Sequence, residues 1–212
     1  MKKIKSYINC CLLVVVICMT YSCSRFDEIN TNPDSATTAT PGMLATGQLI
    51  SWHEGAEDSR KVQYNRINTT GFGVYNSLTN CLKMVELASD VDKEAYQGLA
   101  LFIKVFRLYD TTMSLGDIPY SDALKGEEGN IKPKYDTQKE VFVQMLDDLD
   151  ASYTHFSNAT RNFDGDFVYG GDPEKWKRAV SALQLRILMS LSKKEKEAEL
   201  NVKQRFTAIV SQ

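Results

Sequence analysis

The chain has 212 residues, of which 43% are hydrophobic and 25% are charged, so its composition is that of a globular protein with enough length for one sizeable core. The formal net charge of −2 contains no basic excess, and no cluster of Lys and Arg is interleaved with aromatic residues, which argues against nucleic-acid binding. Three of the five cysteines lie before residue 20, and the other two, Cys23 and Cys81, do not suggest a disulfide framework or a zinc site. We expect Cys81, on the apolar side of a predicted helix, to be a small buried hydrophobic residue.

The chain begins with the pattern of a bacterial signal peptide. Three lysines precede an apolar run over residues 8–21, which is too short to span a bilayer comfortably. Cys23 directly follows the small residue Ser22, as at a lipoprotein processing site, although Thr20 stands where leucine is usual. We therefore expect residues 1–22 to be removed and Cys23 to carry the lipid that anchors the protein to a membrane. The alternative is a plain secretory signal or a signal anchor, with Cys23 as a free thiol.

A polar tether is predicted to link this start to the first helix. Residues 23–39 are rich in Ser, Asn, Thr and Asp and contain a turn signal around a proline. Thr40 and Pro41 then fit the N-cap and the first turn of a helix that ends near Gly55. Apolar residues three and four positions apart predict a second helix over residues 74–88.

The third predicted helix organises the chain. It starts at Asp92 as its cap, and its apolar residues go almost all the way round, as in a helix that is packed on several sides. These residues are Leu99, Leu101, Phe102, Ile103, Val105, Phe106, Leu108 and Met113. The segment GDIPY that follows must turn, because its glycine suits the left-handed position past a helix end and its proline cannot easily extend the helix. We expect this corner to hold the end of the core helix against its neighbours through Gly116, Asp117, Pro119 and Tyr120.

Two later helices have the clearest start signals. Thr137 and Glu140 fit the capping box, in which a hydroxyl and a carboxylate each accept a hydrogen bond from an unpaired amide. Asp172 followed by Pro173 repeats the combination of a cap and a proline, and a continuous apolar face follows. A further helix is expected near the end of the sequence. Because no segment alternates apolar and polar residues over strand length, residues 40–212 are predicted to be an all-α domain.

Four motifs follow one another along the chain. They are GDIPYSDAL at 116–124, KPKYD at 132–136, LDDL at 146–149 and GGDPEKW at 170–176. Together with the core helix, this order resembles the SusD/RagB family of outer-membrane nutrient-binding lipoproteins, particularly its SusD-like branch, over roughly residues 23–195. The resemblance implies antiparallel helical pairs of the tetratricopeptide-like type. Because family members are much longer, it also implies that this chain is an N-terminal portion with an incomplete SusD-like fold.

The sequence gives little support for catalysis or for a metal site. The two histidines, His53 and His155, are not spaced as ligands on one helical face, and no GxSxG nucleophile motif is present. Asp147 and Asp150 could be drawn as the acid and base of a glycosidase, but carboxylates opposite an apolar stripe usually form a solvated helix face. Residues 162–166 imitate the start of a calcium-binding loop, but the glycine that such a loop needs next is missing. We therefore expect no catalytic residue, no metal and no cofactor.

Aromatic residues become candidates for ligand contact if the ligand is a sugar. A pyranose ring packs its C–H face on an aromatic plane, while its hydroxyls bind amides and carboxylates. A loop that forms a site is plausible where the helical pattern is weakest, between the first two predicted helices. Trp176, in contrast, faces an apolar stripe and is expected to be structural. The candidate ligand-binding residues are Trp52, Tyr64, Asn68, Phe72, Tyr75 and Asn76.

The family resemblance implies a lipid-anchored protein on the outer surface of the outer membrane. Such a protein would capture a glycan or another oligomeric nutrient and pass it to a TonB-dependent transporter of the SusC type, without chemical conversion. Two alternatives remain. A helical-repeat scaffold for protein–protein interaction would share the caps and stripes but should lack the lipoprotein start, and a secreted hydrolase would need converging carboxylates or a nucleophile.

Overall fold

Residues 39–58 and 72–211 are described by the computed structural model, with the backbone alone over residues 51–58. The predicted signal peptide, Cys23 and all but the end of the predicted tether lie outside the described residues. Residues 40–212 group into one compact unit.

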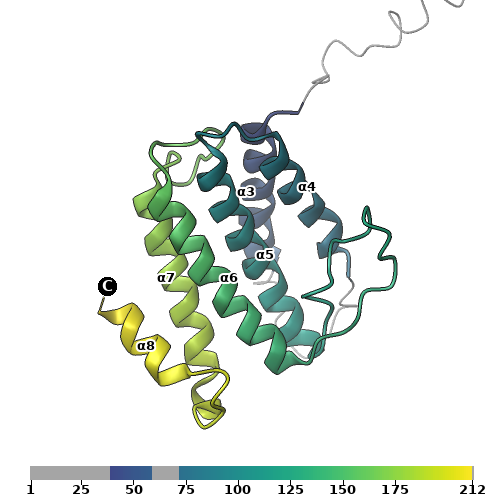
Figure 1. The fold of residues 1–212 in the computed structure, drawn as a ribbon, viewed down its shortest axis with the longest axis vertical. Helices are drawn as coiled ribbons and strands as arrows, with labels where there is room; N and C mark the ends of the chain where they lie inside the picture. The colour runs from purple at the N-terminus through teal and green to yellow at the C-terminus, as the bar shows by residue number, and fades with distance from the viewer. Residues whose placement is uncertain (1–38, 59–71, 212) are drawn as a thin grey trace, which may run out of the picture. The chain divides into compact units, whose positions relative to one another are not determined.

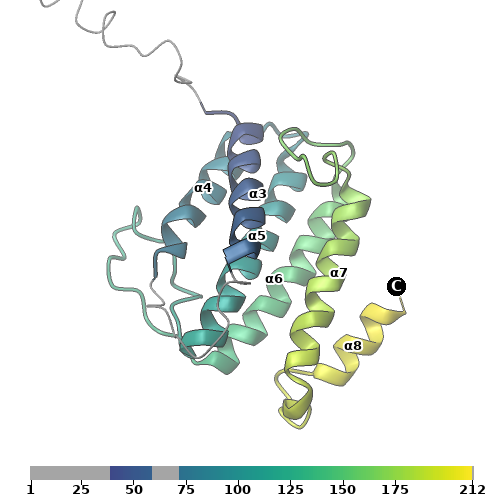
Figure 2. The ribbon, with the colours of Figure 1, turned by 180° about the vertical axis from the view of Figure 1, so that it is seen from behind.

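The described residues fold into six α-helices and one 3₁₀ turn. In chain order these are α3 (Pro41–Asp58), α4 (Val74–Leu87), α5 (Lys93–Leu115), α6 (Gln138–Asn158), α7 (Pro173–Ser190), the 3₁₀ turn η2 (Ser192–Lys194) and α8 (Val202–Val210). Consecutive α-helices contact one another and run antiparallel, as the two views in Figure 1 and Figure 2 show. The described part of the chain contains one isolated β-bridge, between Ile118 and Asp136, and no strand. The prediction of an all-α fold of antiparallel helical pairs is confirmed.

Helix α5 lies at the centre of this arrangement. It contacts α3, α4, α6 and α7, as expected for a helix with apolar residues almost all the way round. Of the eight apolar residues in its predicted core, seven are buried or half-buried. The exception is Met113, near the end of the helix, which is 52% exposed. Cys81 of α4 is 3% exposed, which confirms the prediction of a small buried hydrophobic residue, and burial raises the pKa of its thiol to about 12.

Helices α5 and α6 pack closely at Gly98. A Cβ atom at this position would lie 3.0 Å from two ring atoms of Phe156, so a side chain here would require the ring to shift. The buried Ser152 hydroxyl donates a hydrogen bond to the Gly98 carbonyl at 2.7 Å. The Phe156 ring stacks on Trp176 of α7 with 5.9 Å between ring centroids and 11° between planes. Three consecutive helices therefore meet at one aromatic cluster.

Three predicted caps are present in the structure. The Thr40 hydroxyl accepts a hydrogen bond from the Met43 amide at 3.2 Å, at the start of α3. Thr137 and Glu140 form the complete capping box of α6, and the Asp172 carboxylate accepts from the second residue after it, with proline as the first residue of α7. These starts were predictable because each depends on residues within three positions of one another.

Two predictions about helix ends need correction. Asp92 stands at the N-cap position of α5, but its side chain does not cap the helix. Its carboxylate instead binds the Arg161 guanidinium through two hydrogen bonds of 2.7 Å and accepts a third from Ser89. Helix α3 continues past Gly55 to Asp58, because a glycine inside a helix costs only about 1 kcal/mol and does not by itself end it.

The loop between α6 and α7 is organised by the buried carboxylate of Asp166, which is 8% exposed. The Trp176 indole Nε1 donates to it at 2.7 Å. Three backbone amides also donate to it, those of Val168, Tyr169 and Gly171. The segment that imitates a calcium loop in the sequence therefore uses its carboxylate to satisfy amides and an indole of its own loop and helix.

Replacing Gly98 with Ala should lower the free energy of unfolding. Alanine forms helix better than glycine by about 1 kcal/mol, but overpacking a tight core costs about 1–3 kcal/mol. The Phe156 ring is fully buried and stacked on Trp176, so it cannot easily move away from the new methyl group. We expect a net loss of about 1 kcal/mol, measured by urea unfolding.

Gly47→Ala is the matched control. Gly47 is exposed on α3 and a Cβ there would meet nothing within 4 Å. This variant should therefore gain about 0.5–1 kcal/mol from reduced freedom of the unfolded chain. If Gly98→Ala instead raised the free energy of unfolding by the same amount, the close contact with Phe156 would not be the constraint that we propose.

Candidate functional site

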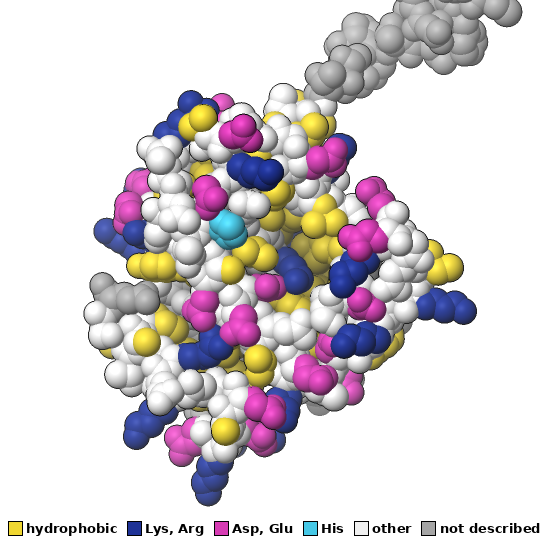
Figure 3. All heavy atoms as spheres, in the orientation of Figure 1, with side chains coloured by type: hydrophobic (Ala, Val, Ile, Leu, Met, Phe, Trp, Pro, Cys, Tyr) yellow, Lys and Arg dark blue, Asp and Glu magenta, His cyan; other side chains and the backbone are white. Residues whose placement is uncertain are grey.

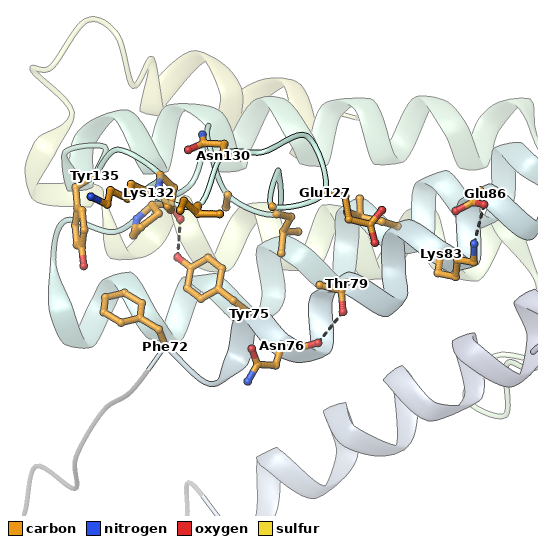
Figure 4. A pocket seen from close by; sticks show the side chains of 17 residues that line it. Phe72, Tyr75, Asn76, Thr79, Lys83, Glu86, Glu127, Asn130, Lys132 and Tyr135 are labelled. Carbon is orange, nitrogen blue, oxygen red and sulfur yellow. Dashed lines mark hydrogen bonds and ion pairs between the residues drawn. The ribbon is translucent and has the colours of Figure 1, made fainter.

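A cavity of about 860 Å³ opens between α4 and the loop that follows α5, within the usual size range of small-molecule sites. Figure 3 shows apolar side chains gathered in a hollow beside α4. As Figure 4 shows, one wall comes from α4 and the residues just before it, and the other from the loop over residues 119–135. The cavity thus combines two segments that lie more than 30 residues apart in the sequence.

Three of the predicted ligand-binding residues lie in the α4 wall: Phe72, Tyr75 and Asn76. The ring centroids of Phe72 and Tyr75 are 5.9 Å apart. The Tyr75 hydroxyl donates to the Pro119 carbonyl at 2.6 Å, which joins the two walls of the cavity. Burial raises the pKa of Tyr75 to about 12, so the hydroxyl keeps its proton and its role as a donor at neutral pH.

The second wall carries aromatic and aliphatic residues that the sequence did not mark as a site. The Tyr135 ring stands perpendicular to Phe72, with 6.0 Å between centroids. Tyr135 is 59% exposed and Ile131 is 81% exposed, so both present apolar surface to the solvent at the cavity. The sequence did contain a clue to this wall. Ile131, Pro133 and Tyr135 are apolar or aromatic residues in a polar loop, where they cannot belong to the apolar face of a helix.

Polar groups of both signs complete the cavity wall. Lys83 and Glu86 of α4 form an exposed ion pair at 2.7 Å, and Glu127 and Lys132 come from the loop. The exposed Asn76 side chain adds an amide, which supplies a donor and an acceptor. The site therefore offers rings and aliphatic groups for packing, together with a few groups for hydrogen bonding.

The corner that ends α5 determines where the loop begins. The Gly116 amide donates to the Thr112 carbonyl at 2.8 Å, and the Thr112 hydroxyl donates to the Gly116 carbonyl at 2.6 Å. Gly116 has a φ of +82°, a conformation that costs residues with a side chain about 1–2 kcal/mol. The Asp117 carboxylate accepts from the Gln138 amide at 2.8 Å. The corner is therefore tied directly to the first turn of α6.

Tyr120 fixes the other side of the corner against two helices. It is 1% exposed, and its hydroxyl donates to the Asp148 carboxylate of α6 at 2.7 Å. The same carboxylate oxygen accepts from Lys104 of α5 at 2.9 Å, and the Lys104 ammonium lies 4.1 Å from the centroid of the Tyr120 ring. Burial, reinforced by the Asp148 charge, holds the pKa of Tyr120 well above its ordinary value, so the hydroxyl remains a donor.

Asp136 closes the base of the loop. Its backbone pairs with Ile118 through two hydrogen bonds of 3.3 and 3.0 Å. Its carboxylate, 3% exposed, accepts from the Tyr120 amide at 3.0 Å and from the Ser121 amide and hydroxyl at 2.7 and 2.8 Å. Burial raises the pKa of Asp136, but these donors and the nearby Lys134 outweigh it and hold the pKa below the ordinary aspartate value.

The other three predicted ligand-binding residues cannot be placed relative to the cavity, because their side chains lie outside the described part of the chain. The backbone of Trp52 lies in α3, and its side chain is outside the described part. Tyr64 and Asn68, like the predicted lipid-attachment residue Cys23, also lie outside the described residues. Their roles stay predictions.

The carboxylates that could suggest a hydrolase lie elsewhere. Asp147 and Asp150 both pair with Arg205 of α8, and Asp150 also accepts from Gln184 of α7 at 2.6 Å. Within residues 39–50 and 72–211, no group of three or more His, Cys, Asp and Glu side chains is placed to hold a metal ion. No helix in the described ranges combines the length and the apolar character needed to cross a bilayer.

The depressed pKa of Asp136 predicts how its contribution to stability varies with pH. Because the folded-state pKa lies below the unfolded value of about 4, the carboxylate stabilises the fold above that pH, and this stabilisation is lost as the pH falls through the folded-state pKa. The difference in unfolding free energy between the native chain and Asp136→Asn should therefore be largest near neutral pH and shrink in acid. Urea unfolding from about pH 7 to about pH 3 measures it. A difference that is independent of pH would contradict the assignment.

The chain is similar to several solved structures. It is 43% identical to a SusD homologue from Bacteroides fragilis, over 82% of this chain and 40% of that chain, with a TM-score of 0.75. It is 30% identical to a protein from Bacteroides vulgatus suggested to be an outer-membrane protein involved in nutrient binding, over 82% of this chain and 41% of that chain, with a TM-score of 0.67. A second SusD homologue from Bacteroides fragilis is 29% identical, over 73% of this chain and 36% of that chain, with a TM-score of 0.60. The chain thus spans about two fifths of the length of the structures it matches.

Comparison with curated proteins gives no significant match. The SusD-like family model, described as starch-binding and associating with the outer membrane, matches residues 25–212. The match therefore begins two residues after the predicted lipid-attachment cysteine and includes every described helix. The chain belongs to the SusD-like family.

Proposed function

We propose that this chain captures a glycan or another oligomeric nutrient in the cavity between α4 and the loop after α5. The observation that carries the proposal is the convergence of Phe72, Tyr75 and Tyr135 with the Asn76 amide in one open cavity, in a chain of this family. The six residues marked in the sequence remain the proposed ligand contacts, and Tyr135 is added to them. Trp52, Tyr64 and Asn68 would contribute from the segment that precedes Phe72.

The chemistry of the cavity suits an oligosaccharide. A sugar ring presents C–H groups on its faces and hydroxyls at its edge, so it packs on exposed rings and binds amides and charged groups at the rim. Phe72 and Tyr135 are both more than 40% exposed, and a ligand that covered them would remove apolar surface from water at about 25 cal/mol per Å². Binding of this kind needs no chemical step, and we infer that the chain holds its ligand without converting it.

The family also supports a location and a partner. We infer that Cys23 carries lipid, that the protein is exposed on the surface of the outer membrane, and that it delivers its ligand to a SusC-type TonB-dependent transporter. The matched structure from Bacteroides vulgatus is suggested to act in nutrient binding at the outer membrane, which agrees with this proposal. A helical-repeat scaffold and a secreted hydrolase remain the alternatives, and the ion pairs of Asp147 and Asp150 with Arg205 give the hydrolase no free carboxylate pair there.

Calorimetric titration with maltoheptaose and a panel of other oligosaccharides tests ligand capture. Phe72→Ala and Tyr135→Ala should each weaken binding by about tenfold, because a lost ring contact is worth about 1–1.5 kcal/mol. Phe167→Ala is the matched control, since Phe167 is 55% exposed but belongs to the loop between α6 and α7 and does not line the cavity. Binding that is lost equally in all three variants, or no binding of any oligosaccharide, would refute the proposed site. Turnover of a bound oligosaccharide would favour the hydrolase.

Anchoring through Cys23 can be tested by Cys23→Ser. The native chain should fractionate with the outer membrane and carry acyl chains on its N-terminal cysteine, as measured by mass spectrometry, because stable anchoring needs more than one chain. The variant should lack both the lipid and the membrane association. Cys18→Ser is the control, since Cys18 lies within the predicted signal peptide and its loss should leave anchoring intact. A Cys23→Ser protein that stays in the membrane fraction would contradict the lipid-anchor hypothesis.

A further inference from the structure

We propose that Asp136, which does not itself line the cavity, is the positioning residue that fixes the loop wall of the ligand site. The inference rests on the proposed function, because it concerns the cavity in which we place the ligand. Asp136 would act through backbone amides, so it would affect binding without touching the ligand.

The loop over residues 119–135 closes on itself at its base. Ile118 and Asp136 stand on either side of it and exchange two backbone hydrogen bonds. The Asp136 carboxylate then reaches across the base and accepts three hydrogen bonds from Tyr120 and Ser121, at 2.7 to 3.0 Å. One buried side chain, just after the end of the loop, therefore binds two residues near its start.

The outer part of the loop is held mainly by its own turns. The amides of Glu128 and Asn130 donate to the Lys125 carbonyl, and the Gly129 amide donates to Gly126. These bonds shape the loop, but they do not attach it to a helix. The hydrogen bonds that attach the loop to the helices lie at the base, where Tyr75 binds Pro119 and Tyr120 binds Asp148, and Leu124 adds an apolar contact with the core. The geometry of the base therefore contributes directly to the position of the outer part relative to α4.

Tyr135 makes the connection to the ligand site direct. It is the residue immediately before Asp136, and its ring forms the perpendicular contact with Phe72. Holding the Asp136 backbone and carboxylate therefore also holds the backbone of Tyr135. Without the carboxylate, three donors at the base lose their acceptor, the loop samples more conformations, and a ligand must order it again on binding.

Asp166 provides a matched control. It is also a buried aspartate, 8% exposed, and its carboxylate likewise accepts several hydrogen bonds within a loop. Its loop joins α6 to α7 at the opposite end of the helices from the 119–135 loop (Figure 1). Replacing it should destabilise the fold as much as replacing Asp136, but it should leave the cavity unchanged.

The experiment compares Asp136→Asn, Asp136→Ala and Asp166→Asn in the purified chain. Maltoheptaose is the first titrant, followed by the oligosaccharide panel, and hydrogen–deuterium exchange is measured over residues 119–135 without ligand. We expect Asp136→Ala to weaken binding by about tenfold, Asp136→Asn to retain part of the affinity through its remaining carbonyl oxygen, and Asp166→Asn to stay within about twofold of the native chain. Exchange in the loop should rise in the Asp136 variants alone.

Two outcomes would overturn the proposal: equal losses of affinity in the Asp136 and Asp166 variants, or a destabilised Asp136→Ala with native affinity and native loop exchange. Should Asp136→Ala fail to fold, Ser121→Ala removes one of the three hydrogen bonds without a buried charge change and should show a smaller effect in the same direction. If the native chain binds no oligosaccharide, the proposed function fails. The exchange measurement still decides whether Asp136 holds the loop.

Discussion

The close contact between α5 and α6 at Gly98 is the constraint on which the rest of the structure depends. Because this position has no side chain, the Phe156 ring can lie against the α5 backbone and stack on Trp176 of the next helix. Trp176 in turn donates to Asp166, whose carboxylate orders the loop at that end of the helices. A chain of contacts thus runs from the side-chain-free position at Gly98 through three helices to one loop.

A buried aspartate also orders the loop at the opposite end of the helices, where the candidate ligand site lies. Asp136 is a second buried aspartate, and its carboxylate accepts hydrogen bonds from Tyr120 and Ser121 of the loop that forms the cavity wall. The Lys104, Tyr120 and Asp148 cluster anchors that loop to the two helices that pack at Gly98. The loop wall of the cavity is therefore anchored to the helical core, although this wall itself contains no helix or strand.

Sequence reasoning succeeded where a signal was local. The capping box at Thr137 and the apolar stripe of α5 depend on neighbours within one or two turns, and both are present. It failed at Asp92, where a distant partner, Arg161, takes the carboxylate that should have capped the helix. For the cavity, sequence reasoning identified residues of the α4 wall, because aromatic residues there occur where the helical pattern is weak. It missed the loop wall, because that wall is placed by hydrogen bonds across the fold, such as Tyr75 to Pro119.

Three consecutive residues at the end of the loop do three different things. Tyr135 faces the cavity, Asp136 ties the loop base together, and Thr137 caps α6. Because these residues are consecutive, the cavity wall, the base of the loop and the start of α6 are joined directly through the backbone. An occupant that contacts Tyr135 would therefore lie within two residues of the N-cap of α6, a helix whose far end packs its Phe156 ring on Trp176.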